Sequence, residues 1–252
     1  MMSSFNLLDG KVALITGCNR GIGKEIARTF VLNGAIVYAN ARRVGSLNIL
    51  IEELPIHLRP SIIPTYFDVN DTNLVRQVFV QIHKEQQHLD CLVNNAGIMK
   101  DALIGMVTKK LMLELFETNV FAVMDLMQYA VKLMSKQKSG SIINISSIAG
   151  TNGHAKQIAY SATKGAVVSI TKTAAKELAE KNIRVNAIAP GIIETELLSE
   201  INSHTMENLK LNIGMGRLGT TNDVANLALF LASDLSEYIT GQTIGVDGAV
   251  LM

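Results

Sequence analysis

Tyr160 and Lys164 are the pair in this chain whose types and spacing most clearly suggest chemistry, in the run YSATK at residues 160–164. Residues four apart on a helix share a face, so we expect the Lys164 ammonium beside the Tyr160 phenol. A nearby cation favours the phenolate and should lower the pKa of the tyrosine from its usual value of about 10. Tyr160 is therefore predicted to act as a general acid or base, although the spacing alone is common on helix surfaces.

A glycine-rich run, TGCNRGIG at residues 16–23, is the second chemical signal. Glycines let the backbone turn tightly and approach a pyrophosphate, which then lies at the N-terminus of the following helix. The spacing is GxxxGxG instead of the general GxGxxG, so the run by itself also fits a strand-to-helix turn without a ligand. Its place directly after the first predicted strand favours a dinucleotide-binding loop.

The end of the second predicted strand should meet the adenosine ribose of such a dinucleotide. It reads Asn40-Ala41-Arg42-Arg43, with no acid to bond a ribose 2′-hydroxyl, and Arg20 lies in the glycine-rich run. Guanidinium groups bind phosphate through paired hydrogen bonds. We therefore predict NADP(H) as the cofactor. The alternative is that Arg42 and Arg43 are solvated residues at the start of a helix.

Short β-branched segments alternate with amphipathic helical stretches, the pattern of a parallel sheet covered by helices. Strands are expected at residues 11–16, 35–41, 61–69, 91–95, 141–146, 183–189 and 243–246. Helices are expected at 21–33, 71–87, 111–136, 157–181 and 222–233. No linker or repeat interrupts this order, so we predict one α/β domain over residues 1–252, a Rossmann-type doubly wound parallel β-sheet of about seven strands. Its cofactor half should span about 1–135 and its catalytic and substrate half about 136–252.

Composition excludes several classes of function. The net charge is +1, which gives no basis for binding nucleic acid. Cys18 and Cys91 are far apart and match neither a disulfide framework nor a metal site, so no metal is predicted. Residues 1–8 lack a charged segment followed by a long apolar one, and no apolar run is long enough to span a membrane. We expect a protein without a signal peptide, located in the cytoplasm.

Several runs spread over the whole chain resemble the motifs of the short-chain dehydrogenase/reductase family. They are TGCNRGIG, NNAG at 94–97, Asn119 in ETNV, Ser147 in INISS, YSATK, and PGIIET at 190–195. Within that family, four stretches are most similar to the 3-oxoacyl-acyl-carrier-protein reductases of fatty acid synthesis. They are NNAGIMKD, RVNAIAPGIIET, MGRLGTTNDVANLALFLASD and YITGQTIGVDG.

The resemblance implies a set of catalytic residues: Asn119, Ser147, Tyr160 and Lys164. Tyr160 would give a proton to the substrate carbonyl oxygen as hydride arrives from the nicotinamide. Lys164 would bind the nicotinamide ribose and lower the pKa of the tyrosine. Ser147 would donate a hydrogen bond to the carbonyl oxygen, where charge develops. Asn119 would hold a water molecule that links Lys164 to solvent.

The resemblance also implies a cofactor site that collects residues from many parts of the chain. They are Gly17, Asn19, Arg20, Gly21, Ile22, Gly23, Arg42, Asp68, Val69, Asn95, Ala96, Gly97, Tyr160, Lys164, Pro190, Gly191, Ile193 and Thr195. Asp68 would meet the adenine amino group, with capping of the next helix as the alternative. Asn95 would lie beside the adenosine ribose, and Thr195 near the nicotinamide carboxamide.

The substrate side is predicted from charge and from the resemblance. Acyl-carrier protein is acidic, so a reductase that receives its cargo should carry positive charge beside the mouth of the active site. Lys138, before the fifth strand, and Lys181, at the end of the catalytic helix, are the residues expected there, with solvated surface lysines as the alternative. His154 and Gln157 should line the substrate side, and residues 196–214, with Met206, should form a lid.

The leading hypothesis is NADPH-dependent reduction of a 3-oxoacyl thioester on acyl-carrier protein to the 3-hydroxyacyl product in fatty acid synthesis. The alternative within enzymes is a ketoreductase or dehydrogenase acting on another small carbonyl or alcohol, such as a sugar, a polyketide or a polyol. A third hypothesis is a non-catalytic nucleotide-binding subunit, but such proteins commonly lose the Tyr or the Lys that this chain keeps. The family is usually tetrameric, so a homotetramer is expected.

Overall fold

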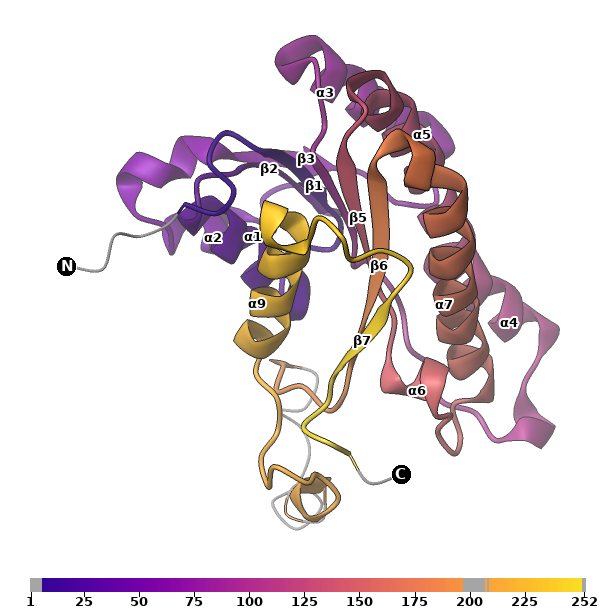
Figure 1. Ribbon diagram of the computed structural model, residues 1–252. Helices are drawn as coiled ribbons and strands as arrows, with labels where there is room; N and C mark the ends of the chain where they lie inside the picture. The colour runs from indigo at the N-terminus through magenta and orange to yellow at the C-terminus, as the bar shows by residue number, and fades with distance from the viewer. Residues whose placement is uncertain (1–5, 197–206, 208, 251–252) are drawn as a thin grey trace.

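A seven-stranded parallel sheet forms the centre of the computed structural model, which describes residues 6–196, 207 and 209–250 (Figure 1). The strand order is β3-β2-β1-β4-β5-β6-β7, and each neighbouring pair is parallel. The strands are β1 (Val12–Ile15), β2 (Ile36–Ala41), β3 (Ile62–Tyr66), β4 (Cys91–Asn94), β5 (Gly140–Ile145), β6 (Ile183–Pro190) and β7 (Thr243–Val246). The predicted fold class is confirmed, and every predicted strand is present, β7 at its predicted bounds and the others with one or both ends shifted.

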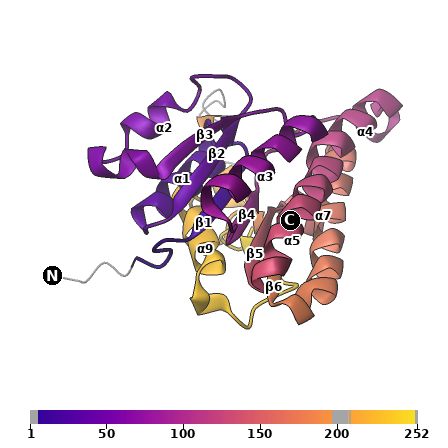
Figure 2. The same cartoon turned by 90° about the horizontal axis from the view of Figure 1, so that it is seen from above.

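Helices cover both faces of this sheet (Figures 1 and 2). One face carries α1 (Gly21–Leu32), α2 (Asn48–Glu52) and α9 (Thr221–Ala232); the other carries α3 (Thr72–Gln86), α4 (Lys109–Phe116), α5 (Ala122–Gln137) and α7 (Ile158–Leu178). Alternate residues of β1 enter the two resulting cores: Ala13 packs with the α1 side, and Leu14 with the α3 and α5 side. Burial on both faces explains why the strands are continuously apolar.

Shorter elements complete the chain. They are the 3-10 turns η1 (Ile56–Ser61), η2 (Ile104–Met106), η4 (Ala179–Lys181) and η6 (Asp234–Ser236), and the one-turn helix α6 (Ile148–Thr151). Neither α2 nor α6 was predicted, because segments this short carry too few residues for a periodic apolar pattern.

The predicted helix at 111–136 is interrupted by a π-helical turn, η3 (Glu117–Phe121), which separates α4 from α5. A π turn inserts one extra residue into the helical repeat and often marks a functional site. Here the turn carries Asn119, whose residue exposure is only 1%. The interruption therefore buries a polar side chain that a regular helix was expected to carry.

Both cysteines, Cys18 and Cys91, are buried and free, and burial raises the pKa of each thiol to about 12. Across the described part of the chain, no helix is long and apolar enough to cross a membrane. Within the same residues, no cluster of His, Cys, Asp and Glu side chains could hold a metal ion.

Candidate active site

The predicted catalytic and cofactor-binding residues meet where the parallel strands end. Gly17 follows β1, Asn95 follows β4, Ser147 follows β5 and Gly191 follows β6, all at the carboxyl edge of the sheet. Ligands of open α/β sheets bind outside this edge. The first turns of α7 bring Tyr160 to the same place.

Ser147 is the N-cap of α6, and its Oγ accepts a hydrogen bond from the Ala149 N–H at 3.1 Å. Because that bond uses a lone pair, the hydroxyl proton stays available for donation. The Ser147 hydroxyl also lies near enough to the Tyr160 phenol to lower the pKa of that group. The structure thus brings together the two hydroxyl groups that the sequence predicts at a substrate carbonyl.

The ionisation of Tyr160 differs from the prediction. Burial raises the pKa of this phenol above its usual value, and the nearby Ser147 hydroxyl lowers it only in part. Lys164 does lie over the Tyr160 ring, with its Nζ 5.8 Å from the centroid, but the ammonium donates to the Ile145 carbonyl at 2.7 Å. The expected lowering was therefore wrong in direction, because helical spacing does not reveal desolvation.

Burial acts on Lys164 as well, lowering its pKa to about 8. Desolvation penalises the charged form of both groups, so the phenol and the amine are each shifted towards neutrality. A phenol held in its protonated form can act as the acid in a reduction, and a lysine that titrates near neutral pH can pass a proton on.

Asn119 joins three segments around this pair. Its Nδ2 donates to the Ile98 carbonyl at 2.9 Å and to Thr163 Oγ1 at 3.1 Å, and its Oδ1 accepts from the Ile98 N–H at 2.8 Å. Both protons of the side-chain amide are thus used, so this side chain could bind a water molecule only by accepting at Oδ1. An added Cβ at Gly97 would lie 3.1 Å from Asn119 Oδ1 and 3.6 Å from Lys164 Nζ, so this glycine keeps the space beside both groups open.

Thr163 is a site residue that the sequence did not single out. It is fully buried, accepts the hydrogen bond from Asn119, and donates to the Tyr160 carbonyl at 2.7 Å. Thr163 therefore connects the π turn to the helix that carries Tyr160 and Lys164. Its position inside YSATK was the only available signal.

The glycine-rich run has the geometry that the sequence predicts. Gly17 and Gly21 have φ values of +72° and +58°, which L side chains rarely adopt. An added Cβ at Gly23 would lie 2.3 Å from both the Gly17 carbonyl oxygen and Asn95 Nδ2. The three glycines are therefore required, and α1 begins at Gly21 with its N-terminal N–H groups at the carboxyl edge.

Polar side chains fasten this loop to the sheet. Asn95 Nδ2 donates to the Thr16 carbonyl at 2.9 Å and to the Gly17 carbonyl at 3.2 Å. Thr16 Oγ1 accepts from the N–H groups of Asn95 and Ala96, both at 3.0 Å, and Asn40 Oδ1 accepts from the Gly17 N–H at 3.2 Å. Asn95, predicted beside a ribose, thus has its side-chain amide engaged with the loop, and no role is predicted from the sequence for Thr16 or Asn40.

The three arginines predicted to select a 2′-phosphate are all exposed: Arg20 at the start of α1, and Arg42 and Arg43 after β2. None of them forms an ion pair with another described residue. Asp68 accepts from the Asn70 N–H at 2.9 Å, whereas the helix α3 is capped by Asp71. The alternative that Asp68 caps this helix was therefore wrong.

The remaining cofactor candidates lie around these groups. Asn19 and Gly97 are exposed, Ile22, Ala96, Gly191 and Thr195 are half-buried, and Val69, Pro190 and Ile193 are buried. Thr195 lies against Gly21, since a Cβ added at Gly21 would be 3.5 Å from Thr195 Cγ2. The structure thus brings the loop after β6 to the glycine-rich run, while the contacts of each residue with a cofactor stay predictions.

A cavity of about 630 Å³ adjoins Gly21 and Thr195 on the α1 side of this edge. Its lining carries four carboxyl groups, of Glu25, Glu53, Glu194 and Glu196, and two cations, Lys24 and Arg28, which pair with Glu53 and Glu25. The excess of negative charge disfavours the phosphates of a nicotinamide dinucleotide. We therefore place the cofactor over the strand ends and not in this cavity.

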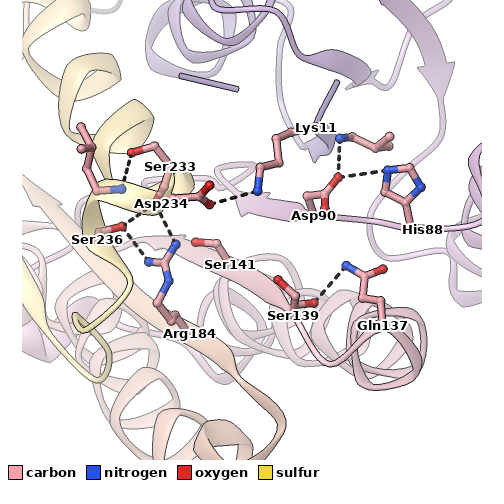
Figure 3. A network of polar contacts seen from close by, with 12 residues as sticks. Lys11, His88, Asp90, Gln137, Ser139, Ser141, Arg184, Ser233, Asp234 and Ser236 are labelled. Atoms are coloured by element: carbon pink, nitrogen blue, oxygen red, sulfur yellow. Dashed lines mark hydrogen bonds and ion pairs between the residues drawn. The ribbon is translucent and has the colours of Figure 1, made fainter. Parts of the chain in front are cut away.

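Lys138 and Lys181 lie at the opposite edge of the sheet. Lys138 precedes β5 and Lys181 precedes β6, whereas Ser147 follows β5. A strand of six residues spans roughly 20 Å, so within one chain neither lysine flanks the mouth beside Ser147, and that expectation was wrong. Figure 3 shows this amino edge, where Gln137 Nε2 donates to the Ser139 carbonyl at 3.0 Å and Lys11 pairs with Asp234 at 3.0 Å.

The predicted substrate loop at residues 153–157 does lie at the carboxyl edge, before α7. His154 is exposed, with its Nδ1 2.8 Å from the Ala155 carbonyl oxygen. Gln157 is half-buried, and its Nε2 donates to Asp101 Oδ1 at 3.0 Å. Of the predicted lid, Met206 lies outside the described residues.

Comparison with known proteins now adds to this geometry. Residues 17–250 match the family described as enoyl-(acyl carrier protein) reductase. The chain is 40% identical over 245 residues to the 3-oxoacyl-acyl-carrier-protein reductase FabG of Thermotoga maritima, covering 97% of this chain and 99% of that protein. The protein belongs to the short-chain dehydrogenase/reductase family. The resemblance drawn from the motifs is thereby confirmed.

Other members of this short-chain dehydrogenase/reductase family show a wider range of activities. The chain is 37% identical over 246 residues to a 3alpha-hydroxysteroid dehydrogenase of Mediterraneibacter gnavus, covering 97% of this chain and 98% of that protein. The solved structure "ElxO with NADP Bound" superposes with a TM-score of 0.90 at 38% identity, covering 95% of this chain and 98% of that one.

Proposed function

We propose that this protein is an NADPH-dependent reductase that converts a 3-oxoacyl thioester on acyl-carrier protein into the 3-hydroxyacyl product. The observation that carries the proposal is the convergence of Ser147, Tyr160 and Lys164 beside the glycine-rich run, at one edge of the sheet. The near full-length identity to reductases of this activity supports the choice of substrate.

The residues present fit a nicotinamide dinucleotide. The backbone of Gly17 and Gly21 turns in the left-handed region, and Gly97 leaves open a space that a Cβ would fill beside Lys164. Arg20, Arg42 and Arg43 supply exposed guanidinium groups where a 2′-phosphate would lie, with no acid at the end of β2. These features favour NADP(H), and a relative of the same fold is described with NADP bound.

The protein residues would perform the acid–base part of a carbonyl reduction. A nicotinamide cofactor, when bound, would supply the hydride for the carbonyl carbon. Ser147 donates a hydrogen bond to the carbonyl oxygen, and Tyr160 transfers its phenolic proton to that oxygen as the alcohol forms. Lys164, whose pKa is lowered to about 8 by burial, can then return a proton to the phenolate. Asn119 holds the segments at Ile98 and Thr163 in place around the pair.

A second candidate function is the reduction of another carbonyl compound, or oxidation of the matching alcohol. It is favoured by the 37% identity to a 3alpha-hydroxysteroid dehydrogenase, close to the 40% identity to the FabG protein. The same Ser147, Tyr160 and Lys164 would serve either substrate, because all three act at the carbonyl group and not on the rest of the molecule.

We also propose that the chain assembles as a homo-oligomer, most simply a tetramer. Large apolar side chains are exposed along α4, η3 and α5: Met112, Leu113, Phe121 and Met124. Exposed apolar side chains gathered on neighbouring elements are typical of protein interfaces.

A cytoplasmic location is consistent with two buried cysteines that form no disulfide.

The test of this function is an NADPH oxidation assay with a panel of substrates: acetoacetyl-acyl-carrier protein, a 3-oxo-steroid and small ketones. Each is run with NADPH and with NADH. We expect the highest kcat/KM with the carrier-bound substrate and NADPH. Turnover of a steroid or small ketone with no turnover of the carrier substrate would replace the leading function by the second.

A further inference from the structure

Two loops at the carboxyl edge are held side by side. One is the segment 98–106, which follows β4; the other, residues 152–157, leads from α6 into α7. The Ala102 N–H donates to the Lys156 carbonyl at 2.7 Å, and Ala102 forms an isolated parallel bridge with Gln157. Gln157 Nε2 donates to Asp101 Oδ1 at 3.0 Å and contacts Met99 Sδ at 3.6 Å. Backbone and side-chain bonds therefore join the same two segments.

This contact reaches Tyr160 through one turn of helix. Gln157 directly precedes α7, and its carbonyl accepts the Ser161 N–H at 2.7 Å, beside Tyr160. Lys156, the residue before Gln157, has a φ of +68°, which residues other than glycine rarely adopt. A backbone conformation of this kind persists where surrounding contacts impose it.

The segment 98–106 is also fixed at its other end. Asn119 bonds both the N–H and the carbonyl of Ile98, and Lys100 pairs with Glu114 of α4. Asp101 and Ala102 are thus the points at which this segment meets the start of α7. Both Nε2 protons of Gln157 point to atoms of the segment, so its amide is engaged in this contact and is not a free donor for a substrate.

We propose that Asp101 and Gln157 are a positioning pair that holds segment 98–106 against the start of α7 and so shapes the mouth through which a carbonyl substrate reaches Tyr160. The inference rests on the proposed function, because it assigns the pair a role in the same site. The pair contacts neither the glycine-rich run nor the arginines after β2, so its loss should weaken binding of the carbonyl substrate and leave cofactor binding unchanged.

A double-mutant cycle that exchanges the hydrogen-bond donor and acceptor of Asp101 and Gln157 tests the pair. Gln157→Glu places a carboxylate against Asp101 and should break the contact. Asp101→Asn keeps an acceptor for Gln157 and should behave as the wild type. The double variant Asp101→Asn, Gln157→Glu restores the bond with donor and acceptor exchanged. We expect Gln157→Glu to raise KM for the carbonyl substrate about fivefold or more, with an unchanged Kd for NADPH, and the double variant to return KM to the wild-type value.

A second measurement does not depend on turnover. Hydrogen exchange at the Ala102 and Ser161 amides should speed up in Gln157→Glu and slow again in the double variant. If the wild type turns over none of the carbonyl substrates tested, the proposed function fails, and the exchange data still decide whether the pair holds the loops. Wild-type exchange and KM in Gln157→Glu, or failure of the double variant to restore them, would overturn the positioning role.

Discussion

Replacing Gly150 with alanine tests whether the contact between α6 and α7 sets the spacing of Ser147 and Tyr160. Gly150 lies in α6, three residues after Ser147. An added Cβ would be 2.6 Å from the Lys164 carbonyl carbon and 2.7 Å from Lys164 Cβ, on the face of α7 that carries the site. These atoms belong to or adjoin the helix backbone and cannot rotate away, so α6 and α7 must separate.

The size of this separation follows from the distances. Ordinary contact for a Cβ begins at 3.4 Å, so relief of the 2.6 Å contact needs a movement of about 0.8 Å. Inserting a methyl group into a close-packed contact costs about 1–3 kcal/mol, and the helix propensity of alanine offsets up to about 1 kcal/mol of that. A displacement of about 1 Å at a reacting group costs about 100-fold in rate. We expect a loss of a few degrees in Tm and a fall in kcat of about 10- to 100-fold.

Thermal unfolding and steady-state kinetics measure the two effects separately. Gly165→Ala is the matched control, because the one atom of the described residues outside α7 within 4 Å of a Cβ added here would be the Gly150 carbonyl oxygen, at 3.4 Å. It should keep the wild-type kcat and an equal or slightly higher Tm. Wild-type kcat and Tm in Gly150→Ala, or equal damage from Gly165→Ala, would refute the reasoning.

Three further predictions concern the buried groups and the cofactor. Thr163→Val leaves an Asn119 amide proton without an acceptor, so it should lower the free energy of unfolding in urea by about 1–3 kcal/mol and lower kcat. Thr163→Ser keeps the acceptor and should keep the wild-type stability and kcat. Equal losses of stability in the two variants would assign the effect to packing. Lys164→Met should abolish turnover. It also removes a buried cation, so at about pH 7 the variant should have a larger free energy of unfolding than the wild type. This difference should shrink by up to about 3 kcal/mol as the pH rises. The reason is that burial lowers the pKa of Lys164 from 10.5 to about 8, so between these values the unfolded chain binds more protons and wild-type stability rises with pH; a gap independent of pH would contradict this. The double variant Arg42→Ala, Arg43→Ala should raise the Kd for NADPH about tenfold while leaving that for NADH unchanged in fluorescence titrations, and equal weakening of both would remove these arginines from the 2′-phosphate site.

The positions of the strands along the chain and the location of the site could be predicted because their signals are local. Buried parallel strands are continuous apolar runs, and the glycine-rich run and YSATK each lie within one segment of chain. The π turn at Glu117–Phe121 left no such signal. Apolar residues continue across it at helical spacing, and one inserted residue does not change that pattern visibly.

The mistaken expectations share a physical cause, which is that they depend on distances between segments. Lys138 and Lys181 adjoin site elements in the sequence, but they precede strands whose opposite ends carry the site. The pKa of Tyr160 is raised by burial, which i, i+4 spacing does not show. Thr163 escaped notice because its hydrogen-bond partner Asn119 is 44 residues away.

The most direct test of the account is a single-turnover experiment with excess enzyme, NADPH and acetoacetyl-acyl-carrier protein. The wild type is compared with Tyr160→Phe, and the hydroxyacyl product is measured by mass spectrometry while NADPH binding is measured by fluorescence. We predict product from the wild type, none from Tyr160→Phe, and equal NADPH binding by both. Product formation by Tyr160→Phe at the wild-type rate would contradict the role given to this residue and the mechanism built on it.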